Sequence, residues 1–301
     1  MTPNNQQWHI AGPGAIGLLY HYKVSELSNF CHSQTPYLIN RSLNNSFEKY
    51  TFINLQQEAQ QIPAKWFKGQ HIIHKLVVTT KSHQVIQCLE SLTPYLANHC
   101  QIILLHNGLG VQQQVTARWP EFDVFFGSST EGVWKSSDNT VHHAGNGITT
   151  FGREHPQKPE WWGEEISKLP NSQWSPDILS QLHNKVAVNA SINPLTILFE
   201  CKNGELLSNE DRLQLLDQLS EESRLVLKSE GYDIPSMKYI VRDIARKTGQ
   251  NYSSSYQDWK HKRTTELSNM NGYIMNLAKK HGLSTPTHDK VMNDVATKAS
   301  I

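Results

Sequence analysis

The sequence contains little cysteine and no long apolar segment, and these absences exclude two classes of protein. Only four of its 301 residues are cysteines, and no two of them form a C-x-x-C pair. We therefore expect reduced thiols in a cytoplasmic protein rather than a disulfide framework. No run of about 20 apolar residues is present that would cross a membrane, and the polar start MTPNNQQ does not resemble a secretory signal.

An excess of charge of one sign is also absent. The chain has 28 basic and 27 acidic residues, so its formal net charge is +1. This balance gives no electrostatic reason to expect a nucleic acid or an anionic membrane as a partner. The histidine spacings at His71/His74 and His142/His143 do not form a four-ligand pattern, so we expect no metal.

What the first half of the chain does contain is a regular alternation of apolar runs and mixed segments. Apolar runs at 8–12, 36–40, 74–81, 101–108 and 123–130 predict strands, and residues 15–29 and 82–96 have helical spacing. Strands separated by helices indicate a parallel sheet covered by helices, because parallel strands need a crossover to return to the same edge. The fold expected here is therefore α/β, a doubly wound Rossmann sheet.

The second half has a different pattern. Residues 141–154 are rich in β-forming residues, and from about Asp177 onward four long segments have helical spacing. We therefore predict two domains, at residues 1–178 and 179–301. The second is expected to be all helical.

Three glycines stand in GPGAIG, between the first predicted strand and the first predicted helix. In that context Gly12 permits a tight turn, Gly14 lets the backbone approach a pyrophosphate, and Gly17 lets the helix and the strand pack closely. Pro13 is acceptable because its missing N–H lies in the turn. The alternative is an ordinary structural turn, but the strand and helix around the motif favour dinucleotide binding.

The residues after the second strand indicate which dinucleotide is bound. A carboxylate there would bind the ribose 2′-hydroxyl of NAD, but the sequence is LINRS, with Arg41 in place of the acid. A guanidinium forms charge-assisted bonds with a 2′-phosphate. This favours NADPH as the cofactor, the alternative being that Arg41 is a solvated surface residue.

One helical segment carries a polar stripe on an otherwise apolar background. Lys185, Asn189 and Asn193 follow one another at i, i+4 and i+8, which places them within about 80° of one face. Such a stripe is either a solvated face or a binding site. Pro194 favours a site, because we expect it to interrupt the helix and free backbone groups beside Asn193.

A second polar cluster lies in NYSSSYQDWKHKRTTELSNMNG. Its hydroxyls and Glu266 offer donors and acceptors to a small polar substrate. The three serines by themselves are typical of a loop or a helix cap.

The motifs GPGAIG, VVTTKSHQ, LLHNGLG, HHAGNGITTFG, NKVAVNASINPLT, CKNGEL and TTELSNMNGY occur here in one order. In that order they resemble the 2-dehydropantoate 2-reductase (ketopantoate reductase) family, over about Trp8 to Val295. The resemblance implies a Rossmann domain followed by a helical domain of the 6-phosphogluconate-dehydrogenase type. It also implies NADPH-dependent reduction of 2-dehydropantoate to pantoate, a small keto-acid substrate, in pantothenate and coenzyme A synthesis.

Carried over by position, the resemblance makes Lys185 both the proton donor and a substrate contact. The other substrate contacts it implies are Asn107, Asn189, Asn193, Asn203, Asn251, Tyr252, Ser253 and Ser254. The cofactor contacts it implies are Gly12, Pro13, Gly14, Ala15, Ile16, Gly17, Arg41, Lys81, Asn107, Val133 (through its backbone) and Glu266. Family members often have a histidine where this chain has Glu131, so the contacts at that position do not carry over.

The residue types suit the chemistry that the resemblance implies. Hydride attack on a ketone develops negative charge on its oxygen, and a protonated lysine stabilises that charge and then donates its proton. Two alternatives stay open: reduction of another branched 2-keto acid, and a non-catalytic NADP(H)-binding sensor. For the assembly we expect a monomer or a homodimer.

Overall fold

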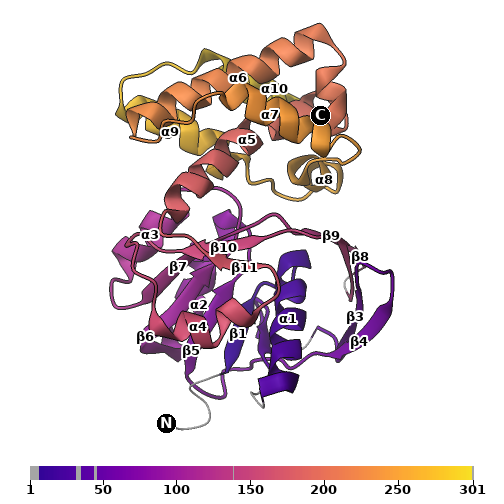
Figure 1. The fold of residues 1–301 in the computed structure, drawn as a ribbon, viewed down its shortest axis with the longest axis vertical. Helices are drawn as coiled ribbons and strands as arrows, with labels where there is room; N and C mark the ends of the chain where they lie inside the picture. The colour runs from indigo at the N-terminus through magenta and orange to yellow at the C-terminus, as the bar shows by residue number, and fades with distance from the viewer. Residues whose placement is uncertain (1–6, 32–34, 44–45, 138, 300–301) are drawn as a thin grey trace. The chain divides into compact units, whose positions relative to one another are not determined.

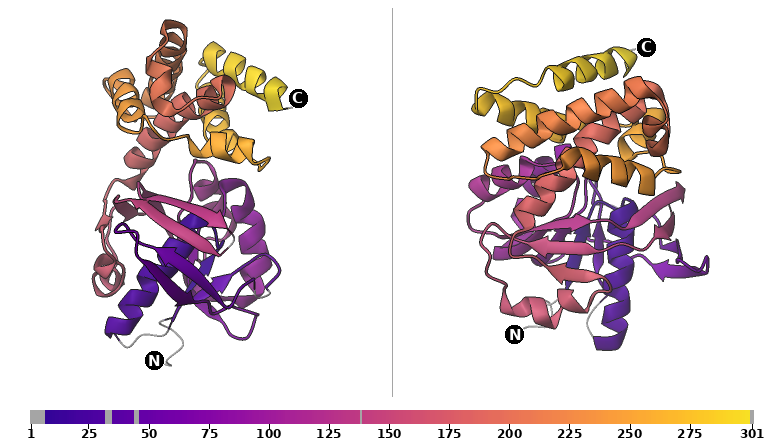
Figure 2. Two further views of the ribbon diagram at one scale, coloured as in Figure 1. Left: turned by 90° about the vertical axis from the view of Figure 1, so that its right-hand side faces the viewer. Right: turned by 45° about the horizontal axis from the view of Figure 1, so that its top comes forward.

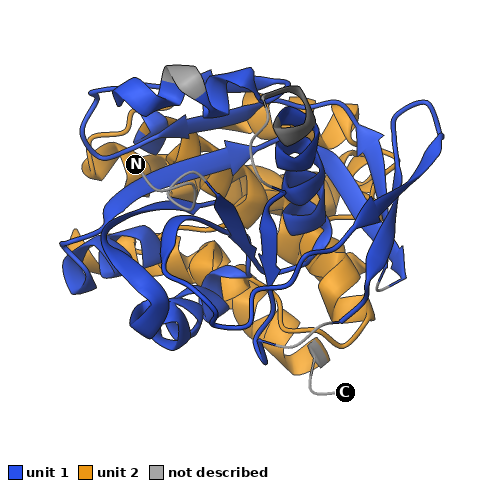
Figure 3. Ribbon diagram, turned by 90° about the horizontal axis from the view of Figure 1, so that it is seen from below, with its two compact units in different colours: residues 1–106, 111–179 blue, residues 107–110, 180–301 orange. Residues whose placement is uncertain are grey.

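The computed structural model describes residues 7–31, 35–43, 46–137 and 139–299. The chain divides into two compact units, coloured separately in Figure 3. The first unit contains residues 1–106 and 111–179, and the second contains residues 107–110 and 180–301. Residues 107–110 thus lie in the first half of the sequence but pack with the helical unit. Whether residues 1–178 and 179–301 divide the function between them remains a prediction.

The first unit is built on a mainly parallel sheet (Figure 1). In the order in which they lie side by side, its described strands are β11 (Ser172–Trp174), β10 (Thr149–Gly152), β7 (Asp123–Ser129), β6 (Leu96–Leu104), β5 (Ile73–Val78), β1 (Trp8–Ala11) and β2 (Tyr37–Ile39). The five strands from β7 to β2 are parallel, and β10 is antiparallel to β7. All residues of β1 are buried, as expected for a central parallel strand, and so are those of β2 at the end of the strand order. The predicted Rossmann sheet is therefore confirmed.

Helices accompany this sheet. They are α1 (Ala15–Cys31), η2 (Ser82–Gln84), α2 (Val85–Leu92), η3 (Thr93–Tyr95), α3 (Val111–Arg118), α4 (Glu160–Glu164) and η4 (Ile166–Lys168). Leu18, Leu19 and Tyr20 of α1 are almost fully buried in the same apolar cluster as Ile10 of β1 and Phe151 of β10. This packing fixes the start of α1 beside the end of β1.

A second, smaller sheet lies in the same unit, and the sequence pattern does not distinguish its strands from those of the first. Its strands, in spatial order, are β4 (Ala59–Pro63), β3 (Lys49–Ile53), β9 (Thr140–Gly145) and β8 (Gly132–Ser137). Figures 1 and 2 show it beside α1. Tyr50 and Phe52 of β3 are buried, and the Phe52 ring stacks on Tyr22 of α1 with centroids 3.8 Å apart.

The second unit is helical in all its described long elements (Figure 2). These are α5 (Ile178–Phe199), η5 (Asn203–Leu207), α6 (Glu210–Ser229), α7 (Met237–Lys247), α8 (Ser254–Lys260), η6 (Leu267–Asn269), α9 (Asn271–Lys280) and α10 (Pro286–Ala299). Local capping sets several of these ends. Asn209 accepts a hydrogen bond from Arg212 N at 3.0 Å, and Ser253 accepts one from Tyr256 N at 3.0 Å.

The expectation that Pro194 interrupts its helix is wrong. Helix α5 continues through Pro194 to Phe199. A proline lacks an N–H, so the carbonyl four residues earlier, that of Ala190, loses its helical donor. The side-chain amide of Asn271 on α9 replaces it, donating to Ala190 O at 2.8 Å. The freed backbone group is therefore satisfied within the protein and is not offered to a ligand.

Among the residues that the structure describes, no helix combines the length and the apolar character needed to span a bilayer.

Candidate cofactor and substrate sites

The three glycines of GPGAIG have different surroundings. Gly12 has a φ of +95°, and a Cβ there would lie 2.8 Å from Thr80 N. A Cβ on Gly17 would lie 2.0 Å from Gly12 O, inside the helix–strand contact. A Cβ on Gly14 would meet nothing within 4 Å. Gly12 and Gly17 are thus required by the fold itself, whereas the space at Gly14 is open to a ligand.

The loop that contains these glycines leads directly into the start of α1. Gly12 N donates to Ile39 O at 3.1 Å and Gly14 N donates to Gly12 O at 2.7 Å. Helix α1 then begins at Ala15, with Ile16 in its first turn. The first N–H groups of a helix lack intrahelical acceptors and favour anions, so this end of α1 suits a pyrophosphate.

A cavity of about 600 Å³ adjoins this loop. It is lined by Gly12, Pro13, Ile39, Asn40, Arg41, Thr80, Gln84, Gln87, Cys88, Ser91 and Leu92. The exposed Arg41 lies at its wall, and no carboxylate of the described residues forms an ion pair with its guanidinium. Burial raises the pKa of the Cys88 thiol to about 11, and the charge of Arg41 partly opposes this. The positive field of Arg41 therefore reaches the cavity.

Two further predicted cofactor residues lie in the same unit. Lys81 is half-buried at the residue before η2, in the short connection from β5. Val133 lies on β8, partly buried against the apolar cluster that includes α1. Sequence reasoning missed Lys135, whose Nζ lies 3.5 Å from Pro13 O in the glycine loop. This lysine reaches the loop only because β8 pairs with β9 in the second sheet, so no local sequence motif marks it.

Glu131 has a structural role in the described chain. Its carboxylate is fully buried, pairs with Lys23 of α1, and lies 2.7 Å from His143 Nε2 on β9. It also accepts a hydrogen bond from Gly147 N at 3.2 Å. These bonds join the small sheet to α1, so the departure from the family pattern at Glu131 is compensated by charged and polar partners inside the fold.

In the second unit, Lys185, Glu266 and Asn107 form the centre of the candidate substrate site. Burial lowers the pKa of Lys185 to about 8, and the nearby carboxylate of Glu266 partly offsets this by raising it. Glu266 is itself buried, and Asn107 Nδ2 donates to its Oε2 at 3.3 Å. A half-buried lysine whose pKa approaches neutrality is a candidate general acid.

The helical stripe continues along α5 from this centre. Asn189 is half-buried and Asn193 is buried. Asn193 Nδ2 donates to Ser255 Oγ at 3.1 Å and contacts Met270 Sδ at 3.5 Å. The predicted stripe therefore runs from half-buried residues to a buried one and is not fully solvated. Asn193 is held by contacts from α8 and from the residue before α9.

The remaining predicted substrate residues lie around the start of α8 and of η5. Ser253 caps α8 and lies 2.7 Å from Thr196 Oγ1 of α5, so its hydroxyl is occupied within the fold. Asn203 N donates to Asn251 O at 3.0 Å, and Asn203 Nδ2 donates to Thr248 Oγ1 at 2.9 Å. The buried Asn203 Oδ1 has no hydrogen-bond partner among the described residues. Asn251, Tyr252 and Ser254 are exposed.

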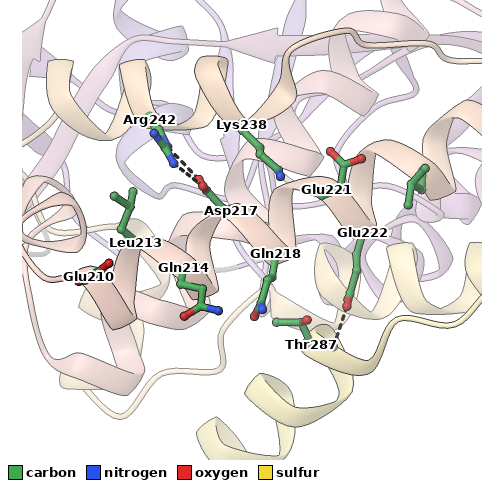
Figure 4. A pocket seen from close by; sticks show the side chains of 11 residues that line it. Glu210, Leu213, Gln214, Asp217, Gln218, Glu221, Glu222, Lys238, Arg242 and Thr287 are labelled. Carbon is green, nitrogen blue, oxygen red and sulfur yellow. Dashed lines mark hydrogen bonds and ion pairs between the residues drawn. The ribbon is translucent and has the colours of Figure 1, made fainter.

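A larger cavity of about 800 Å³ in the same unit contains none of these residues (Figure 4). It runs along α6, and several of its charges are paired within the fold. Arg242 forms two bonds with Asp217, and Glu222 accepts hydrogen bonds from Thr287 N at 2.8 Å and His288 N at 3.0 Å. Glu222 thus caps α10, and the groove is a poor candidate for the reaction site.

Solved structures with the same fold include a ketopantoate reductase of Ralstonia eutropha. It has a TM-score of 0.84 and 17% identity, and the match covers 98% of this chain and 99% of that one. Another is D-mandelate dehydrogenase with NADH and anilino(oxo)acetate, with a TM-score of 0.82, 18% identity and 98% coverage of both chains. Identities this low establish the shared fold alone.

Sequence relatives are closer. The chain is 28% identical over 298 residues to a 2-dehydropantoate 2-reductase of Vibrio cholerae, covering 96% of each. It is 31% identical over 230 residues to that of Yersinia pestis, covering 75% of this chain and 74% of the relative. The family descriptions "Ketopantoate reductase PanE/ApbA" and "Ketopantoate reductase PanE/ApbA C terminal" match residues 8–155 and 177–299. Together with the glycine loop and Lys185, these matches show that the chain belongs to the ketopantoate reductase family.

Proposed function

We propose that this chain is an NADPH-dependent 2-dehydropantoate 2-reductase that forms (R)-pantoate in pantothenate and coenzyme A synthesis. Residues 1–178 bind the cofactor and residues 179–301 bind the substrate. The observation that carries the proposal is Lys185 beside the buried Glu266, with a lysine pKa of about 8. A general acid is most effective when its pKa lies near the working pH.

The first unit fits a phosphorylated dinucleotide. The open space at Gly14 admits a pyrophosphate, and the exposed Arg41 at the wall of the adjoining cavity suits a 2′-phosphate. Pro13, Ala15, Ile16 and Gly17 complete the loop, and we place Lys81 and Val133 near the nicotinamide half. When bound, NADPH supplies the hydride. Any role of Glu266 in contacting the cofactor remains part of this proposal.

The second unit supplies the proton. Lys185 in its ammonium form stabilises the negative charge that develops on the ketone oxygen, and then transfers its proton to that oxygen. Glu266 keeps the lysine charged by raising its pKa, and Asn107 holds the Glu266 carboxylate through their hydrogen bond. The lysine is neutral after transfer and regains its proton from solvent before the next turnover.

Neutral and hydroxyl groups around the lysine bind the rest of the substrate. The orphaned Oδ1 of Asn203 is an acceptor for a substrate hydroxyl, because a buried polar atom without a partner costs stability. Asn189 lies one turn from Lys185 on the same face of α5. Asn193 holds this face in place through Ser255, and Asn251, Tyr252, Ser253 and Ser254 form the neighbouring loop and helix start.

Reduction of another 2-keto acid is the second candidate function. One observation favours it, since the fold matches D-mandelate dehydrogenase about as well as it matches a ketopantoate reductase. The sequence relatives favour 2-dehydropantoate. The retention of Lys185, both asparagines of the stripe and Glu266 disfavours a non-catalytic sensor.

The test is the fall in NADPH absorbance with 2-dehydropantoate, phenylglyoxylate and small unbranched 2-keto acids. The expected result is the highest kcat/KM for 2-dehydropantoate. Lys185→Ala should lower kcat by about 10²–10⁴-fold and leave NADPH binding nearly unchanged. The control Lys279→Ala, at an exposed position on α9, should keep wild-type turnover. Normal turnover by Lys185→Ala would show that another residue donates the proton, and Lys81 would be the next candidate.

Two further properties belong to this proposal. A structure of a ketopantoate reductase from Staphylococcus aureus is described as dimeric, so we include a homodimer beside a monomer as the assembly. We also place the reaction in the cytoplasm. Size-exclusion chromatography with light scattering distinguishes the two assemblies.

A further inference from the structure

The loop Asn107–Gly110 follows β6 in sequence but packs with the helical unit. Leu109 N donates to Asn269 O at 2.9 Å. A Cβ on Gly108 would lie 2.7 Å from both the Cβ and the backbone oxygen of Asn269. The loop is therefore pressed against η6, and its path leaves no space for a side chain at Gly108.

The end of the same loop rests on an aromatic ring. Gly110 has a φ of +95°, and a Cβ there would lie 3.3 Å from Cδ2 of Tyr273 on α9. The ring of Tyr273 thus forms the surface against which Gly110 lies. A shorter side chain at position 273 would leave the end of the loop without this support.

The position of the Tyr273 ring is itself fixed by His183 on α5, whose ring rests in turn on Tyr232 in the segment after α6. Tyr273 Oη lies 2.9 Å from His183 Nε2 on α5, a hydrogen bond. The buried His183 ring stacks on Tyr232 with centroids 3.8 Å apart. Burial also raises the pKa of Tyr273 to about 12, so its phenol stays protonated and the hydrogen bond persists. The ring and the hydroxyl of Tyr273 are therefore both held by contacts within the helical unit.

The start of the loop carries a group that the reaction uses. Asn107 is bonded to Glu266, and Glu266 faces Lys185. A shift of the loop moves Asn107 relative to this pair, and displacements of about 1 Å in an active site cost up to a hundredfold in rate.

We propose that Tyr273 is a positioning residue that acts through Asn107 on Glu266 and Lys185. It contacts the loop, not the substrate, and His183 orients its ring. The inference rests on the proposed role of Lys185 and Glu266 in the reduction. It extends the set of residues that determine turnover to the tyrosine that ends TTELSNMNGY, to which the resemblance assigns no role.

A double-mutant cycle between Tyr273 and Asn107 tests this. Tyr273→Leu should lower kcat by about tenfold to a hundredfold while the KM for NADPH stays unchanged. In an Asn107→Ala background the same change should lower kcat by less than about twofold, because the group through which it acts is already gone. The control Tyr239→Leu alters a tyrosine on α7 that is 70% exposed, and it should leave kcat unchanged in both backgrounds.

Tyr273→Phe distinguishes the ring from the hydroxyl. It keeps the surface under Gly110 and should retain most of the turnover. If Tyr273→Leu does not fold, Gly110→Ala serves as the second variant, since its added methyl carbon meets the ring, and its loss of kcat should likewise vanish in the Asn107→Ala background.

Equal losses in the two backgrounds would overturn the proposal, as would unchanged kcat in Tyr273→Leu. Failure of the proposed function would look different, because the wild type itself would then not reduce 2-dehydropantoate.

Discussion

The side-chain amide of Asn271 donates to the backbone carbonyl of Ala190 at 2.8 Å, in place of the N–H that Pro194 lacks. Asn271 is fully buried, and its Nδ2 also lies 3.1 Å from His288 Nδ1. His288 Nε2 lies in turn 3.0 Å from Ser223 Oγ. One buried asparagine thus joins α5, α9 and α10, and it does so where the helix carrying Lys185 has lost a backbone hydrogen bond.

Asn271→Ala should therefore destabilise the fold by about 1–3 kcal/mol, because it leaves a buried carbonyl without a donor. Pro194→Ala restores a helical N–H to that carbonyl, so it should recover part of the loss in the Asn271→Ala protein. Urea unfolding of both single variants and the double variant measures this. If Pro194→Ala changes the free energy of unfolding equally in both backgrounds, the two residues are not coupled.

Glu266→Gln should shift the alkaline limit of activity to lower pH. Lys185 donates its proton only when charged, so turnover is present below its pKa of about 8 and is lost as the pH rises through that value. Glu266 raises this pKa, so removing its charge lowers the pKa further. The pH dependence of kcat measures the shift.

A matched control for this variant is Glu210→Gln, which removes an exposed carboxylate from the first turn of α6. Its pH profile should equal that of the wild type. An unchanged alkaline limit in Glu266→Gln would show that Glu266 does not set the protonation of the lysine.

Arg41→Ala should weaken NADPH binding and leave NADH binding nearly unaffected. A hydrogen bond to a charged group contributes about 1.5–3 kcal/mol, which corresponds to roughly ten- to a hundredfold or so in affinity. Fluorescence titration with each cofactor gives the two dissociation constants. Arg118→Ala, at an exposed arginine on α3, is the control. Equal weakening of both cofactors would mean that Arg41 does not recognise the 2′-phosphate.

Gly14→Val should abolish cofactor binding while the fold is retained. A Cβ at this position meets no protein atom within 4 Å, so the added side chain occupies only the space left for the pyrophosphate. Gly14→Ala should give an intermediate affinity, and thermal unfolding without cofactor should be similar for all three proteins. If Gly14→Val binds NADPH as strongly as the wild type, GPGAIG is an ordinary structural turn and not a cofactor-binding loop.

Local patterns in the sequence predicted the Rossmann sheet, the glycine loop and the helical second half. The length and periodicity of an apolar run, which indicate a buried strand, depend only on residues that are neighbours in the sequence. The same is true of the order of strand, glycines and helix around Gly14. The polar stripe of Lys185, Asn189 and Asn193 was also visible, because helical periodicity alone places these residues on one face. The assignment of these residues to catalysis and binding stays a prediction.

Contacts between distant segments decided the rest, and periodicity does not encode them. Pro194 has a strong local tendency to end a helix, but α5 continues because Asn271, 77 residues later in the sequence, replaces the missing donor. Glu131 is one isolated acid until the fold brings Lys23 and His143 to it. The loop after β6 joins the helical unit because the surfaces of Asn269 and Tyr273 fit its two glycines, and this pairing exists only in the folded chain.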